Sequence, residues 1–126
     1  MKVFGPLAAA LLAIGASAPA AAANIYFQDV PLEPPLNWIY GEKLGYRIID
    51  VFDSLYENYT AEGWAGFIAQ KCIDTLLCQG TLTYTVSDNA SKNRLGVTFR
   101  GPWLYSYNFE REKGIEDSVA ANKVEN

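Results

Sequence analysis

The chain has 126 residues, with 10 basic and 14 acidic side chains, a formal net charge of −4 and no histidine. An acidic domain repels the phosphate backbone of nucleic acids, so nucleic acids are disfavoured as partners. The absence of histidine excludes serine–histidine and cysteine–histidine catalysis and removes the favoured zinc ligand. We find no phosphate-binding glycine loop, dinucleotide fingerprint or calcium loop, and therefore expect no cofactor and no metal.

The first 23 residues have the order of an export signal. Lys2 supplies a positive charge, an apolar stretch runs from Val3 to Ile14, and small residues follow up to Ala23. The apolar stretch is shorter than the roughly 18 residues that a membrane-spanning helix needs, although an uncleaved anchor is the alternative. We predict a signal peptide over 1–23, cleavage before Asn24, and a secreted, extracellular domain without a membrane span. Because Lys2 is the only charged residue removed, the mature net charge is −5.

The mature sequence begins with an extended, proline-containing segment. Residues 24–38 mix apolar side chains with Pro31, Pro34 and Pro35, which lack the amide proton that helices and central strands require. We predict an edge strand over 25–30, followed by a lead-in that packs on the domain.

Two helices are predicted next. Apolar residues recur at helical spacing from Leu44 to Tyr59, which predicts a helix ending near Asn58. Thr60 is then an N-cap for a second helix that ends by about Leu77. Alanines at intervals of four in this second helix let two backbones approach, so we expect the two helices to pack together.

Cys72 and Cys78 are the only two cysteines, and an even pair in an exported chain predicts one disulfide. On a continuous helix, residues six apart are separated by about 9 Å along the axis, which is too far for a bridge. The second helix must therefore end between them. Two free, buried thiols are the alternative.

After Gly80 the apolar period changes from the helical value to 2. Alternation over 81–86 and 95–100 predicts a hairpin with a polar loop, and 103–109 predicts a third strand after a turn at Gly101 and Pro102. The charged segment 112–126 is expected to be a disordered tail. The prediction is therefore one α+β domain over 24–111, with two packed helices followed by a three-stranded antiparallel meander.

The predicted third strand carries the candidate binding surface. Trp103, Tyr105, Tyr107 and Phe109 would project from one face, where aromatic rings can anchor a protein interface or stack on a sugar. The same four rings would equally serve as core under the helices, because a small domain needs bulky residues.

Carboxylates provide the one catalytic alternative. Asp50, Asp53 and Glu57 share the first predicted helix and could approach the separation that a carboxylate-dependent hydrolase uses. They lie on its polar side, where a solvated helix face explains them equally well.

The sequence also contains two N-glycosylation motifs, at Asn58 and Asn89, both in predicted turns. In size, export and cysteine content the chain resembles small secreted effector-like and toxin-like proteins. We therefore predict a non-enzymatic protein that binds an extracellular or host protein or glycan, with a carbohydrate-binding or cell-wall module and a small hydrolase as alternatives.

Overall fold

The computed structural model describes residues 24–126, so the predicted signal peptide lies outside the described residues. Its centre is an antiparallel sheet in the order β1-β7-β4-β5-β3. The strands are β1 (Ile25–Asp29), β3 (Ile48–Leu55), β4 (Cys78–Ser87), β5 (Lys92–Arg100) and β7 (Ile115–Glu125). No helix in the described part of the chain is long and apolar enough to cross a membrane.

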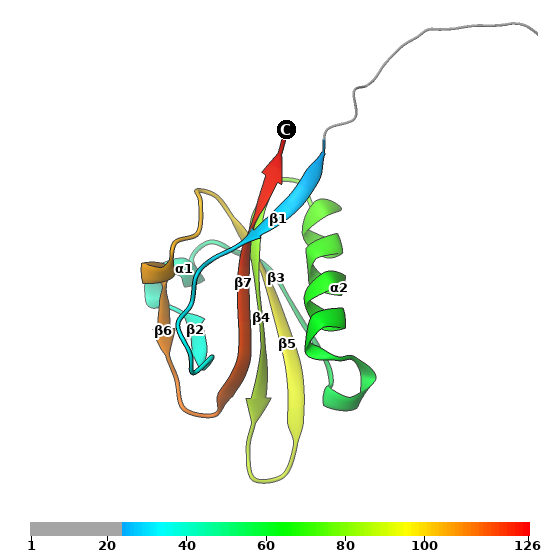
Figure 1. Cartoon of the computed structure of the whole chain (residues 1–126), viewed down its shortest axis with the longest axis vertical. Helices are drawn as coiled ribbons and strands as arrows, with labels where there is room; N and C mark the ends of the chain where they lie inside the picture. The colour runs from blue at the N-terminus through cyan, green and yellow to red at the C-terminus, as the bar shows by residue number, and fades with distance from the viewer. Residues whose placement is uncertain (1–23) are drawn as a thin grey trace, which may run out of the picture.

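Different elements cover the two faces of this sheet (Figure 1). Helix α2 (Ala61–Ile73) packs on one face. On the other lie the two-stranded ribbon of β2 (Trp38–Tyr40) and β6 (Phe109–Arg111) and the one-turn helix α1 (Glu42–Gly45). Two short 3-10 helices, η2 (Tyr56–Asn58) and η3 (Ser106–Asn108), complete the elements.

The predicted pair of packed helices with a three-stranded meander is therefore wrong. The predicted edge strand β1, helix α2 with its Thr60 cap, and the β4–β5 hairpin are present. The first predicted helix, the third meander strand and the disordered tail are each replaced by another structure.

The segment predicted as the first helix forms β3 instead. It contains Ile48, Ile49, Val51 and Phe52, and β-branched and aromatic side chains favour strands. The apolar spacing is helical, but in the strand it leaves Val51 and Leu55 exposed at 56% and 55%. Burial on an edge strand is incomplete, so the apolar pattern there does not follow the strand period.

Helix α2 rests on the threonine face of the hairpin, which alternation alone would place in solvent. Thr81, Thr83, Thr85 and Thr98 are all buried. Gly96 allows the close approach, since a Cβ there would lie 2.4 Å from Ile68 of α2. Short side chains on this face therefore let the helix lie directly on the sheet.

The larger apolar core lies on the other face of the sheet, under the β2–β6 ribbon. Its buried members come from the lead-in, α1, three central strands and the segment between β5 and β7: Val30, Leu44, Leu82, Tyr84, Val97, Phe99, Leu104, Phe109, Ile115 and Ala120. The lead-in and the ribbon thus replace the two predicted helices as the cover of the hairpin's apolar side.

The segment predicted as a disordered tail is the inner strand β7, paired with β1 on one side and β4 on the other. Its buried positions are largely small or polar, including Ser118, Ala120, Ala121 and Asn122. Ser118 Oγ accepts a hydrogen bond from the Trp38 amide at 2.9 Å. This strand is held by ladder pairing and by polar contacts to crossing segments, so its sequence lacks a strong apolar signal.

Candidate functional site

The segment 101–109, which we call the tyrosine loop, is the most distinctive surface feature among the described residues. It does not form the predicted third strand: after the Gly101–Pro102 turn it runs irregularly into η3 and then enters β6. The four aromatic residues therefore do not share a strand face. Trp103 is half-buried, Phe109 is buried in the core, and Tyr105 and Tyr107 are exposed.

Tyr105 and Tyr107 stack on each other at the surface. Their ring centroids are 5.2 Å apart and the ring planes differ by 6°. Exposed fractions of 47% for Tyr105 and 79% for Tyr107 leave apolar ring surface and hydroxyl groups accessible together. Tyrosine offers large contact area with few rotatable bonds, a combination that suits recognition surfaces.

A buried asparagine holds the first half of the loop. Asn122 of β7 is 1% exposed, and its side-chain amide accepts from the Leu104 N–H at 2.7 Å and donates to the Leu104 carbonyl at 2.9 Å. Both backbone groups of Leu104 are thereby satisfied without a neighbouring strand. Leu104 also buries its side chain in the core, so the loop is fixed just before the tyrosines.

The second half of the loop is held by reciprocal hydrogen bonds around η3. The Tyr105 amide donates to Asn108 Oδ1 at 2.8 Å, and the Asn108 amide donates to the Tyr105 carbonyl at 2.9 Å. The Gly41 amide then donates to the Asn108 carbonyl at 2.8 Å. A Cβ at Gly41 would lie 2.9 Å from that oxygen, so this approach requires glycine. The tyrosines are therefore presented by a loop that is anchored on both sides.

Arg47 lies beside the loop and places a cation next to Tyr107. Its guanidinium donates to the Arg100 carbonyl at 3.1 Å and to the Pro102 carbonyl. Burial lowers the pKa of Arg47 below its usual value, while the nearby Tyr107 phenol acts in the opposite direction. Arg47 thus holds the turn at the start of the loop through the Arg100 and Pro102 carbonyls.

Tyr107 borders two hollows in the surface. One, of about 330 Å³, is also lined by Glu33, Trp38 and Phe109. The other, of about 460 Å³, has Glu42 and Glu110 in its walls. An exposed aromatic residue flanked by hollows with carboxylates offers both apolar contact and hydrogen-bond acceptors to a ligand.

The carboxylates considered for hydrolysis are not arranged as the helix prediction required. Asp50 and Asp53 both lie in β3, and residues three apart on a strand point to opposite faces of the sheet. The shared helix that would have brought these two carboxylates close together is therefore absent. Within residues 24–126, no group of three or more acidic or cysteine side chains is arranged to hold a metal ion.

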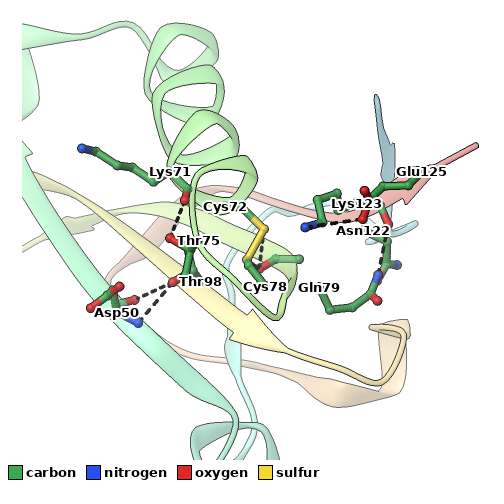
Figure 2. Close-up of a disulfide and its surroundings, with 11 residues drawn as sticks. Asp50, Lys71, Cys72, Thr75, Cys78, Gln79, Thr98, Asn122, Lys123 and Glu125 are labelled. Atoms are coloured by element: carbon green, nitrogen blue, oxygen red, sulfur yellow. Dashed lines mark hydrogen bonds and ion pairs between the residues drawn. A yellow bond between two sulfur atoms is a disulfide. The ribbon is translucent and has the colours of Figure 1, made fainter. Parts of the chain in front are cut away.

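The predicted disulfide is present and joins the end of α2 to the start of β4 (Figure 2). The Cα atoms of Cys72 and Cys78 are 5.3 Å apart, and α2 ends at Ile73, as the bridge requires. The bridged loop exposes Leu76 and Leu77 beside a hollow of about 630 Å³.

Both N-glycosylation motifs lie at the surface. Asn58 ends η2 and Asn89 lies in the β4–β5 hairpin loop, and both side chains are exposed. Their glycosylation stays a prediction.

Comparison with protein-family models, with curated proteins and with solved structures found no match. The site therefore has to be interpreted from its own geometry. Sequence reasoning singled out Tyr105 and Tyr107 but missed Gly41, Arg47 and Asn122, which hold them. The one available signal was Asn122, a polar residue that follows Val119, Ala120 and Ala121 in the supposed tail.

Proposed function

We propose that the chain is a secreted, non-enzymatic protein that binds a macromolecule outside the cell through its tyrosine loop, and that the target is a protein. The observation that carries this proposal is the exposure of the stacked Tyr105–Tyr107 pair on a loop anchored by Asn122 and Gly41. A preordered aromatic anchor loses little conformational entropy on binding, which favours affinity. The sequence's export signal supports the extracellular setting.

The proposal is tested with the mature domain, residues 24–126, immobilised on a support. We expect the wild type to retain a set of extracellular proteins that a Tyr105→Ser/Tyr107→Ser double variant does not retain. Tyr26→Ser is the matched control, because Tyr26 is about as exposed as Tyr105 but lies on β1. Equal retention by the wild type and the double variant contradicts the proposal.

A glycan target is the second candidate, and the two hollows beside Tyr107 favour it. Their walls contribute Trp38, Glu33, Glu42 and Glu110, which offer a stacking surface and acceptors for hydroxyl groups. Chitin or glucan oligomers that enter the first hollow would change the fluorescence of Trp38. Saturable quenching that the double tyrosine variant abolishes supports the glycan target, and a flat titration rejects it for those oligomers.

A further inference from the structure

A second surface lies between helix α2 and the edge strand β3. Helix α2 and the β2–β6 ribbon, into which the tyrosine loop leads, cover opposite faces of the sheet (Figure 1). Within residues 24–126, β3 pairs only with β5. Every second residue of an edge strand directs its N–H and C=O groups outward, where another strand can pair with them.

An aromatic hollow lies next to this open edge. Its volume is about 310 Å³, and its walls come from residues 51–54 of β3 and from Tyr59, Trp64 and Phe67. The three rings form one cluster, with centroid separations of 5.0 Å for Tyr59–Trp64, 5.6 Å for Tyr59–Phe67 and 5.4 Å for Trp64–Phe67. A hollow with such walls favours an apolar or aromatic side chain.

The ring cluster beside β3 is held in place by the segment that connects β3 to α2. Arg94 Nε donates to the Tyr56 carbonyl at 3.2 Å and to the Tyr59 carbonyl at 2.9 Å, and its guanidinium lies 4.2 Å from the Tyr56 ring centroid. Trp64 Nε1 donates to the Leu95 carbonyl at 2.9 Å. The ring cluster is therefore tied to the sheet beside which a peptide would lie.

The charge along this edge selects the occupant. Asp50, Asp53 and Glu57 are exposed, and residues 48–58 contain no lysine or arginine. The nearby cation is Lys71 of α2, whose Nζ lies 5.2 Å from the Phe67 ring centroid and 5.9 Å from that of Phe52, so the acidic groups outnumber it along this edge. A second copy of the chain would bring the same acidic edge. Like charges brought side by side on neighbouring strands destabilise a sheet. A basic partner strand has the complementary charge.

We propose that β3 and α2 form a groove that binds an extended, basic segment of a partner protein by strand addition. The segment pairs with the outer edge of β3, packs one apolar side chain against the cluster of Tyr59, Trp64 and Phe67, and places lysine or arginine near Asp53. This surface is separate from the tyrosine loop.

The test is an NMR titration of the mature domain with a capped peptide of eight residues, the length of β3. The peptide alternates lysine with valine and carries one central tryptophan. We expect saturable binding, with amide shifts concentrated in β3 and residues 59–67. Two control peptides are expected not to bind: one with glutamate at each lysine, and one with alternate backbone amides N-methylated, which removes the strand hydrogen bonds but keeps the side chains.

Protein variants separate the parts of the groove. Asp53→Lys and Phe67→Ala are each expected to weaken binding of the lysine peptide by about tenfold. Tyr107→Ser is expected to leave it unchanged, so failure of this groove and failure of the tyrosine loop are distinguishable. Asp53 is exposed, so its variant keeps the test valid if Phe67→Ala does not fold.

The proposal is overturned if the lysine peptide does not bind, or if the N-methylated or charge-reversed peptide binds equally well. It is also overturned if the amide shifts lie outside the groove. A sedimentation experiment that shows a dimer, together with β3 shifts that disappear on dilution, assigns the edge to a second copy and equally rejects the basic peptide.

Discussion

Replacing Asn122 by alanine tests whether one buried amide holds the tyrosine loop. The variant removes both hydrogen bonds to Leu104 and leaves that buried N–H and carbonyl without their partner. An unsatisfied buried group costs about 1–3 kcal/mol, so for the two groups the free energy of unfolding is expected to fall by about 2–6 kcal/mol in total. This is a large part of the roughly 5–15 kcal/mol that stabilises a typical domain.

The assay for Asn122→Ala is urea unfolding of residues 24–126, followed by tryptophan fluorescence. With an m value of about 2 kcal/mol/M, in the middle of the range of about 1–3 for a small domain, the midpoint is expected to fall by about 1–3 M at unchanged slope. Hydrogen exchange at the Leu104 amide is expected to accelerate. Asn89→Ala is the matched control, because Asn89 is an exposed residue in the hairpin loop and its loss should leave the midpoint unchanged. A midpoint for Asn122→Ala that equals the control refutes the proposed anchoring.

Three further predictions concern the sheet and its helix. Gly96→Ala places a methyl group 2.4 Å from a side chain of α2 and should destabilise the domain by about 1–3 kcal/mol. Gly66→Ala, with nothing within 4 Å, should stabilise the domain by up to about 1 kcal/mol, and urea midpoints distinguish the two variants. Replacing both Cys72 and Cys78 by alanine should cost about 2 kcal/mol, and reductant should then have no further effect on the midpoint. Burial raises the pKa of Tyr84 from 10.0 to about 12. Its contribution to stability is complete below about pH 10 and is lost as the pH rises to about 12, and Tyr84→Phe should flatten that decline.

The features that sequence could predict are those set by local chemistry. The Thr60 cap, helix α2 and the β4–β5 hairpin each follow from residues close together in the chain. The disulfide followed from the single pair of cysteines, and the distance between residues six apart on a helix then required the helix to end between Cys72 and Cys78. The exposed Tyr105 and Tyr107 were identified as candidates, although on a strand that does not form.

The errors arise where burial depends on distant parts of the chain. In β3, the apolar residues Val51 and Leu55 face solvent at the sheet edge, so their spacing imitates a helix. The threonines of the hairpin are buried under α2, because Gly96 and the short hydroxyl side chains let the helix lie on them. Neither outcome is readable from apolar periodicity, since both depend on which element covers which face.

The two interaction surfaces were unequally accessible to sequence reasoning. The sequence shows the tyrosines as candidate binding residues because they are aromatic. It does not show their anchor, because the contact between Asn122 and Leu104 joins residues 18 positions apart. The groove requires that β3 be an edge strand, which the helix prediction excluded. Its ring cluster combines Tyr59 with Trp64 and Phe67 of α2, and it gains significance only beside an unpaired strand.

The position of β7 constrains the order in which the chain can assemble. This strand follows all the others in the sequence, yet it supplies the pairing partner of both β1 and β4 and the amide that holds Leu104. A growing polypeptide that has not yet extended through residues 115–125 therefore has β1 without a neighbour and the tyrosine loop without its anchor. At that stage the β3–β5–β4 sheet, helix α2 and the β2–β6 ribbon are among the elements whose residues have all been made. The tyrosine loop is consequently anchored only after residues 115–125 have been made.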